Sequence, residues 1–151
     1  SKELIARLRD KSDDIVAVGT TSVRTLESIY WMGVKRLEGY SDFADVSQWE
    51  CYTLPDRYTL REAMEALLGW FEETGDGRLK AATTIIILPG YRYRVIDALF
   101  TNFHQPQSTL LLLVAAAIGD DWKKVYDYAL ARNFRFLSYG DSSLLRVRNK
   151  K

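Results

Sequence analysis

The sequence predicts an α/β fold, a three-layer α/β/α arrangement around a mostly parallel sheet that its last strands make mixed. Short β-branched runs alternate along the chain with longer stretches of helical apolar spacing, an order typical of this class. Hydrophobic residues occupy 47% of the 151 positions, beside only nine glycines and three prolines. A chain of this length buries roughly 68–70% of its unfolded surface. We therefore expect residues 1–151 to form a single domain with a core of its own.

The N-terminal part predicts a helix, a strand and a second helix. Apolar residues at helical spacing over 4–8 indicate a short opening helix. The aliphatic run at 15–18 ends at Gly19 and is typical of a fully buried strand. Between 23 and 34 the apolar residues recur every three or four positions, which predicts an amphipathic helix.

The middle of the chain predicts a long loop, a helix and a strand. Turn formers and aromatics mix over 38–59, so we expect an ordered loop there, and loops of this length are usually functional. Helical spacing returns over 60–71 and stops at the glycine-containing segment 74–77. A second buried strand is expected at 83–88.

The C-terminal half predicts further strands and two helices. We expect an extended segment at 91–102, with alternate residues on opposite faces. Ser108 is the expected N-cap of an apolar helix over 109–118. The remaining expected elements are a helix from Asp120 to about Asn133, strands at 134–137 and 144–147, and a turn at 139–141.

Composition excludes several classes of protein. Cys51 is the only cysteine, which excludes a disulfide scaffold, and with one histidine it makes a poor metal-ligand set. The 21 Lys+Arg against 20 Asp+Glu give a net charge of +1, too little for a general polyanion binder. The longest apolar run, 110–118, is about half of the ~18 residues that a membrane span needs. The start of the chain has neither an initiator Met nor a signal-peptide pattern, so we expect a cytoplasmic protein, cut from a longer one.

Parallel sheets bind ligands at the carboxyl ends of their strands, which directs attention to the loops 19–22, 101–108 and 138–142. The first joins a strand to a helix, whose N-terminal N–H groups can hold an anion. The alternative is a hydroxyl that caps the helix and a solvated arginine. The candidate residues of this turn are Gly19, Thr20, Thr21, Ser22 and Arg24.

The stretch 89–110 contains two titratable candidates. Asp97 lies among apolar residues, so it is either paired structurally with an arginine or held for chemistry. His104, the only histidine, follows a strand and is either a general acid or base or a hydrogen-bonding anchor of its loop.

Aromatic and basic residues suggest contacts with nucleotides, although packing or a solvated surface explains each of them as well. Tyr91 could lie against a base or a sulfonium cation, and Arg92 and Arg94 could meet phosphates. Trp49, in the long loop, could contact a base, and Asp141, beside Tyr139, could accept a hydrogen bond from a sugar or stabilise its own turn. RNA backbone contact or a solvated tail are the alternatives for the C-terminal residues Arg146, Arg148, Lys150 and Lys151.

Three blocks together identify a resemblance: AVGTTSVRTLES, PGYRYRVIDALFTNFHQPQSTLLLLVAAAIG and FRFLSYGDSSLL, with QWECY as a fourth. They closely resemble the C-terminal part of the S-adenosylmethionine:tRNA ribosyltransferase-isomerases of queuosine biosynthesis, the QueA family. The blocks are in family order and span nearly the whole chain. One departure is Gln105, where many members have Leu. The family's N-terminal portion, with its inserted β-barrel, has no counterpart here, so the resemblance implies a partial copy of the family's larger domain.

The resemblance implies a transfer of the ribosyl moiety of S-adenosylmethionine onto 7-aminomethyl-7-deazaguanine in the tRNA wobble position. The product is epoxyqueuosine, and adenine and methionine leave. S-adenosylmethionine is then a substrate, no cofactor is expected, and the partners are this tRNA and the missing N-terminal half of the enzyme, without a membrane. The fragment alone is expected to be inactive.

The resemblance also implies roles for the candidate residues. His104 or Asp97 would act as the base or as the acid that assists adenine departure. The turn at 19–22 with Arg24 would receive the methionine carboxylate or a tRNA phosphate. Further substrate contacts are expected from Tyr91, Asn102, Ser108, Thr109, Tyr139 and Asp141, and RNA contacts from Arg92, Arg94 and Trp49. Two alternatives remain: a noncatalytic RNA- or nucleotide-binding module, and a domain whose motif residues are all structural.

Overall fold

The computed structural model describes residues 1–148. The chain folds into two compact units, each described by itself. The first unit comprises Ser1–Asp13 and Thr25–Ile85, and the second comprises Asp14–Arg24 and the chain from Ile86 onward. Five α-helices and mostly parallel strand pairing within the described residues confirm the mixed α/β class.

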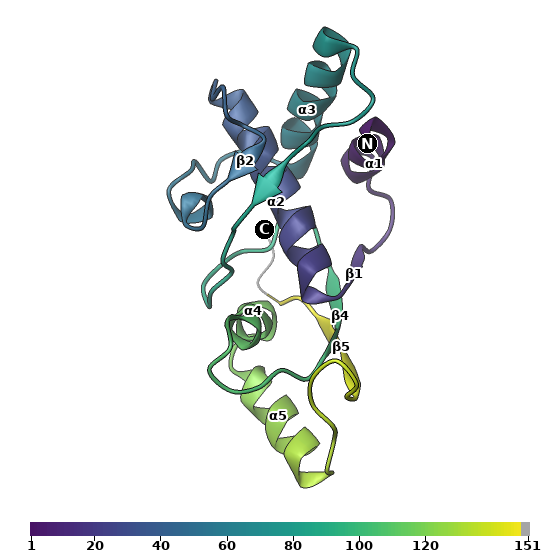
Figure 1. Cartoon of the computed structure of the whole chain (residues 1–151), viewed down its shortest axis with the longest axis vertical. Coiled ribbons are helices and arrows are strands. Elements are labelled where there is room, and N and C mark those ends of the chain that lie inside the picture. Colours follow the sequence, from purple (N-terminus) through teal and green to yellow (C-terminus); the bar gives the residue numbers. More distant parts are fainter. Residues whose placement is uncertain (149–151) are drawn as a thin grey trace. The chain divides into compact units, whose positions relative to one another are not determined.

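The second unit is built on a three-stranded sheet with the order β1 (Val16–Val18), β4 (Ala98–Asn102) and β5 (Ser142–Arg146). β1 and β4 are parallel, whereas β5 runs antiparallel to β4, and the three strands lie side by side in Figure 1. The mixed sheet is therefore confirmed, but its antiparallel pair is β4 with β5 rather than a hairpin at the C-terminus.

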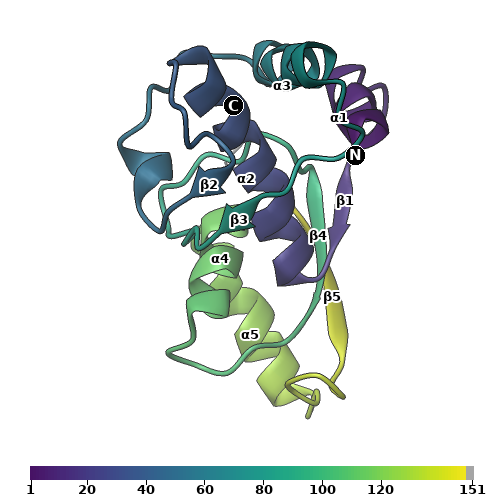
Figure 2. The same ribbon diagram turned by 45° about the horizontal axis from the view of Figure 1, so that its top comes forward.

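Two helices lie on one side of these strands (Figure 2): α4 (Thr109–Ile118) and α5 (Asp121–Ala131). The Ser108 hydroxyl accepts a hydrogen bond from the backbone N–H of Leu111 at 3.2 Å, so Ser108 caps α4 as predicted. α4 is almost entirely buried because it carries apolar residues all round.

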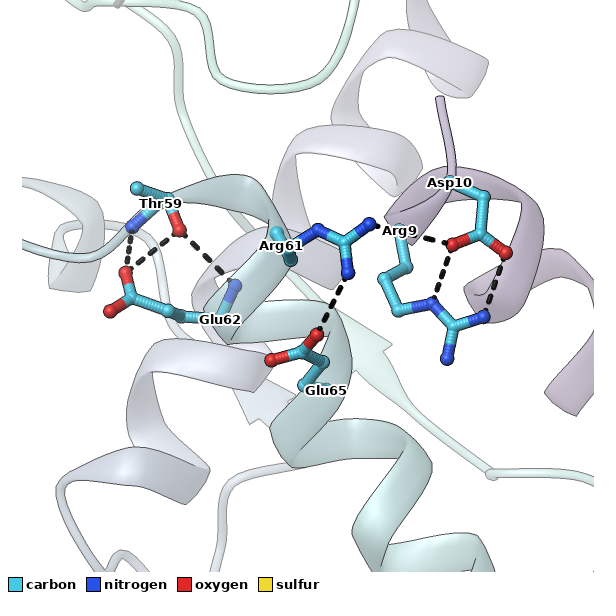
Figure 3. Close-up of polar contacts among 6 residues, drawn as sticks. All are labelled: Arg9, Asp10, Thr59, Arg61, Glu62 and Glu65. Carbon is cyan, nitrogen blue, oxygen red and sulfur yellow. Dashed lines mark hydrogen bonds and ion pairs between the residues drawn. The ribbon is translucent and has the colours of Figure 1, made fainter. Parts of the chain in front are cut away.

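Three helices supply most of the first unit: α1 (Lys2–Arg9), α2 (Thr20–Leu37), whose first turn belongs to the second unit, and α3 (Leu60–Thr74). Figure 3 shows how polar contacts fix the start of α3 beside α1. Thr59 and Glu62 form a capping box, and Arg61 bridges Glu65 on its own helix and Asp10 after α1.

The loop predicted at 38–59 contains short ordered elements. It includes the strand β2 (Asp45–Val46) and the 3-10 helix η1 (Glu50–Tyr52). β2 pairs in parallel with β3 (Ala82–Thr83), so the first unit holds a separate two-stranded sheet.

The strand predicted at 83–88 is wrong beyond Thr83. Ile85 and Ile87 are buried, as the apolar run suggested, yet the segment after β3 has no strand partner among the described residues. A segment that is buried by side-chain packing alone, without hydrogen bonds to a neighbouring strand, has the same apolar pattern in its sequence as a buried strand.

Two further strand predictions are corrected. The extended segment expected at 91–102 is regular only in β4, and Arg94 is buried, so the solvated surface that was the alternative for this arginine is wrong. No strand forms at 134–137, where Leu137 has a φ of 70° that breaks any extended run. None of the helices in the described residues is long and apolar enough to cross a membrane.

Candidate functional site

Three loops of the second unit meet at one edge of its sheet. Because β1 and β4 are parallel, the turn after Val18 and the segment after Asn102 emerge together. β5 runs the other way, so its first residue, Ser142, pairs with Asn102 and brings the loop before it to the same edge. We call this place, formed by residues 19–24, 101–109 and 138–142, the loop edge.

The first loop is a single-residue turn. Gly19 has a φ of 85°, which favours glycine, and its N–H donates to the carbonyl oxygen of Phe100 at 2.8 Å. Its own carbonyl accepts from Val23, so α2 begins at Thr20 and Gly19 takes the N-cap position. The first-turn N–H groups of α2, which include those of Thr21 and Ser22, have no acceptor in the helix and are available to an anion. The hydroxyl residues Thr21 and Ser22 thus lie inside the first turn of α2 and neither takes the N-cap position, and Arg24 follows them, half-buried.

His104 lies half-buried just after β4. Its Nε2 is 3.0 Å from the hydroxyl of Thr101, and its backbone N–H donates to the phenol oxygen of Tyr126 at 3.0 Å. Burial lowers the pKa of His104 below its usual value and raises the pKa of Tyr126. Burial therefore favours the neutral imidazole, which is the form that can accept a proton.

Asn102 joins the second loop to the third. Its side-chain amide donates to the carbonyl oxygen of Gly140 at 3.1 Å and lies 3.3 Å from the Ser142 hydroxyl. Ser108 donates to the carbonyl of Gln105 at 2.9 Å in addition to capping α4, and Thr109, the first residue of α4, is exposed. The hydrogen bonds of Asn102 and Ser108 hold the conformations of their loops. These two residues therefore have a structural role, whether or not they also contact a substrate.

The third loop is closed by its own aspartate. Asp141 accepts a hydrogen bond from the N–H of Arg135 at 2.7 Å, and its N–H returns one to the Arg135 carbonyl at 2.8 Å. The Arg135 backbone N–H holds the pKa of Asp141 below its usual value, against a smaller opposing effect of burial. Tyr139, at the tip of this loop, is 95% exposed and is free of packing constraints that would prevent stacking on a ligand.

Asp97 lies at the other end of β4. One carboxylate oxygen accepts from the N–H of Ile15 at 2.8 Å, and the backbone N–H of Asp97 donates to the Ile15 carbonyl at 2.8 Å. The five residues of β4 lie between Asp97 and His104, and at about 3.3 Å each they alone put roughly 16 Å between the two. The structure therefore does not bring the two catalytic candidates together, and Asp97 ties the start of β1 to β4.

The basic and aromatic candidates before β4 are not part of the three loops that form the loop edge. Tyr91 is buried against Tyr93, with ring centroids 5.3 Å apart, and Arg92 is exposed. Arg94 is buried, and its Nε donates to the carbonyl of Arg92 at 2.9 Å. Trp49 is exposed in the first unit, beside Tyr52. Lys150 and Lys151 lie outside the described residues.

Sequence reasoning missed the partners of His104. Thr101 and Tyr126 contact the histidine, but Tyr126 is 22 positions away on a helix and carries no motif. Thr101 lies three positions before His104, a spacing that gives no signal in an extended segment. Among the described residues, no three His, Cys, Asp or Glu side chains gather where they could hold a metal ion.

Comparisons with known proteins point to one family. The family model described as "Queuosine biosynthesis protein" matches residues 1–145. An S-adenosylmethionine:tRNA ribosyltransferase-isomerase from Roseobacter denitrificans is 53% identical over 74 residues, which cover 46% of this chain and 21% of that protein. One from Cereibacter sphaeroides is 55% identical over 67 residues, 44% of this chain and 19% of that protein.

A solved structure is similar over almost the whole chain. The crystal structure of an S-adenosylmethionine tRNA ribosyltransferase from Thermotoga maritima matches with a TM-score of 0.60 and 34% sequence identity. The match covers 95% of this chain but 38% of that one. The chain thus spans well under half the length of the relatives that it matches.

Proposed function

The chain belongs to the queuosine biosynthesis protein family, and on that premise we propose that it is part of an S-adenosylmethionine:tRNA ribosyltransferase-isomerase. The reaction moves the ribosyl moiety of S-adenosylmethionine onto the aminomethyl nitrogen of 7-aminomethyl-7-deazaguanine in tRNA. Adenine and methionine leave, and the modified base becomes epoxyqueuosine. The family match over residues 1–145 is the observation that carries this proposal.

The loop edge is the proposed binding place for S-adenosylmethionine. The N–H groups of the first turn of α2 and the guanidinium of Arg24 suit the methionine carboxylate, because both favour an anion. Asn102, Ser108 and Thr109 present polar groups for the ribose hydroxyls, and exposed Tyr139 offers a ring for adenine. All of these residues belong to the three loops that converge on this edge.

His104 is the proposed acid–base group. It lies at the loop edge, and burial favours its neutral form, so it can take a proton from the carbon beside the sulfonium; the imidazolium formed in this way can then give that proton to departing adenine. Asp97 is proposed to be structural, because its carboxylate holds the Ile15 N–H at the far end of β4.

Calorimetry of the chain with S-adenosylmethionine tests the binding proposal. We expect binding that Arg24→Gln weakens at least about tenfold, since a charge-assisted contact is lost. Arg132→Gln, at the C-terminus of α5, is the matched control and is expected to leave affinity unchanged. A chain that binds an anticodon stem-loop but not S-adenosylmethionine would instead be a noncatalytic RNA-binding module.

Single-turnover kinetics test the catalytic proposal in the longer enzyme that contains this chain, because the chain alone is expected to be inactive. His104→Ala should slow adenine release by about 10²–10⁴, the usual contribution of a general acid or base. Asp97→Asn should leave the rate of the folded enzyme within a few-fold. An unchanged rate for His104→Ala removes this residue from the chemistry.

A further inference from the structure

The two nitrogens of the His104 ring have different surroundings. Nε2 lies 3.0 Å from the hydroxyl of Thr101, a residue that is only 5% exposed. Among residues 1–148, Nδ1 has no hydrogen-bond partner. The hydroxyl therefore occupies Nε2 inside the protein, and Nδ1 is the ring nitrogen that is left for a ligand at the loop edge.

Thr101 has a fixed position, because it lies in β4, the central strand of its sheet. Its register partner on β5 is Ser143, whose hydroxyl donates to the carbonyl oxygen of Thr101 at 3.4 Å. A side chain on a paired strand is held more precisely than one on a loop. The Thr101 hydroxyl can therefore fix the orientation of the imidazole.

The backbone of His104 is held from a second element. Its N–H donates to the phenol oxygen of Tyr126 at 3.0 Å, and Tyr126 is buried on α5. The Tyr126 ring packs edge-on against the rings of Phe103 and Phe136, with centroids 5.3 Å and 6.0 Å away. With the backbone held by Tyr126 and Nε2 held by Thr101, the imidazole presents a defined edge to the loops around it.

We propose that Thr101 is a positioning residue for His104: its hydroxyl oxygen accepts a hydrogen bond from Nε2–H, so that Nδ1 is the nitrogen that takes the substrate proton. The inference rests on the proposed function, in which His104 is the acid–base group. A neutral imidazole carries one proton, and the hydrogen bond made by one ring nitrogen sets which tautomer forms. A base at Nδ1 requires that proton on Nε2, where the Thr101 oxygen accepts it.

The proton transfers balance with this assignment. The lone pair of Nδ1 takes the proton from the carbon beside the sulfonium, and the electron pair of the broken C–H bond stays on that carbon. The imidazolium then carries a proton on each nitrogen, and Nε2–H still donates to the Thr101 oxygen. When Nδ1–H passes its proton to departing adenine, the ring returns to its starting tautomer. Thr101 thus favours the charged form, because hydrogen bonds to ionised groups are the stronger ones.

The Thr101 hydroxyl is not itself the reacting group. A hydroxyl at 3.0 Å from a histidine nitrogen is also the arrangement of a nucleophile and its base. A nucleophile must reach the carbon that it attacks, however, and the Thr101 side chain is buried. Its role is therefore to orient His104.

NMR of the folded chain tests the position of the proton directly. At pH 8 the imidazole is neutral, and the ¹⁵N chemical shifts of its nitrogens show which one carries the proton. We expect a single tautomer with the proton on Nε2. Thr101→Val keeps the branched shape but removes the hydroxyl, so the two tautomers should mix, whereas Thr101→Ser should keep the single tautomer. Ser143→Ala removes the neighbouring hydroxyl and is the matched control, which should leave the spectrum unchanged.

Single-turnover kinetics of the longer enzyme test the consequence for the reaction. Thr101→Val should slow adenine release by about 10–100-fold, the usual loss for one hydrogen bond to a charged group, and Thr101→Ser should stay within about threefold of the wild type. Added to His104→Ala, Thr101→Val should cause no further loss, because Thr101 acts only through His104. Ser143→Ala should again leave the rate unchanged.

Four results would overturn the proposal. In the spectra, they are a wild-type proton on Nδ1 and a tautomer that Thr101→Val leaves unchanged. In the kinetics, they are a rate that Thr101→Val leaves unchanged and a further loss when Thr101→Val is added to His104→Ala. Circular dichroism of each variant confirms that it is folded. A wild-type rate in the His104→Ala enzyme would overturn the acid–base role in the proposed function, whereas the spectra of the chain would still decide whether Thr101 holds Nε2.

Discussion

The ammonium nitrogen of Lys35 lies 3.0 Å from a carboxylate oxygen of Glu50 and 2.6 Å from the carbonyl oxygen of Asp45, although the lysine side chain is only 1% exposed. Glu50 in turn accepts a hydrogen bond from the N–H of Ser47 at 2.6 Å. One buried cation on α2 thus holds β2 and η1, and with them the long segment at 38–59. Buried charges are tolerated when they are paired and hydrogen-bonded in this way.

Replacing Lys35 with Met should destabilise the first unit by about 2–3 kcal/mol, because the carboxylate and the carbonyl lose a charged donor. The free energy of unfolding from urea titration measures the effect. Lys124→Met, an exposed lysine on α5, is the control and should change it by less than about 0.5 kcal/mol. A loss as small as the control's would mean that Lys35 does not hold this segment.

The stability that Glu50 contributes should depend on pH. Burial raises the pKa of Glu50, but the Ser47 N–H and the Lys35 ammonium outweigh it, so the folded pKa lies below the usual value of 4.5. This contribution is therefore present above about pH 4.5 and is lost as the pH falls through the folded pKa. Urea titrations from pH 7 to pH 3 should show Glu50→Gln less stable than the wild type at pH 7 and converging with it in acid. A constant difference would contradict the ion-pair account.

Two helical glycines should respond oppositely to alanine. A Cβ at Gly33 would lie 2.3 Å from the carbonyl oxygen of Ala63 on α3, so Gly33→Ala should cost about 1–3 kcal/mol by forcing α2 and α3 apart. Nothing lies within 4 Å of a Cβ at Gly69, so Gly69→Ala should stabilise the chain by about 0.5–1 kcal/mol through helix propensity. Thermal unfolding of both variants measures the change in Tm, which should be negative for Gly33→Ala and positive for Gly69→Ala. Equal changes in Tm would contradict the close approach of α2 and α3 at Gly33.

His104 should titrate below its usual pKa of 6.5, because burial disfavours the imidazolium. Protonation then favours the unfolded chain, so the free energy of unfolding falls as the pH drops from about 6.5 through the folded pKa. The chain has one histidine, so its imidazole NMR resonances are unambiguous and give this pKa directly. His104→Gln should abolish this part of the pH dependence of stability. A measured pKa at or above 6.5 would contradict the buried environment.

Cys51 should be unreactive in the folded chain. Burial raises the pKa of its thiol to about 12, which lowers the thiolate fraction near neutral pH about a thousandfold. Alkylation at pH 8 should therefore be slow in buffer and fast in urea, followed by mass spectrometry. Rapid labelling of the folded protein would show that η1 opens readily.

The elements that the sequence predicted well are those whose signals are local. Ser108 before an apolar run and Gly75 after another mark the ends of α4 and α3, because caps act within a few residues. The strand predictions at 83–88 and 134–137 were wrong because a strand forms only when its backbone is hydrogen-bonded to a neighbouring strand. Ile85 and Ile87 are buried without one, and Leu137 adopts a positive φ that no apolar pattern reveals.

The convergence of the first two candidate loops followed from the parallel direction of β1 and β4, which the alternation of strands and helices predicted. The third loop reaches the same edge for another reason, because β5 begins there and runs antiparallel to β4. What could not be predicted is contact that depends on register or on distant helices. Thr101 and Tyr126 reach His104 only through the placement of β4 and α5, and the roughly 16 Å between Asp97 and His104 follows from where β4 begins and ends. Lys35 gave no signal either, because a lysine on a helix is usually exposed.

The pairing of β1 with β4 sets the order of events during synthesis. Ile15 and Asp97, which join the two strands, are 82 positions apart, and most of the first unit, Thr25–Ile85, lies between them. At about 5–20 residues per second, β1 waits roughly 4–16 s on the ribosome before its partner strand exists. The intervening helices can form in that interval, and closing the sheet then requires joining the ends of an already compacted segment rather than of a free loop.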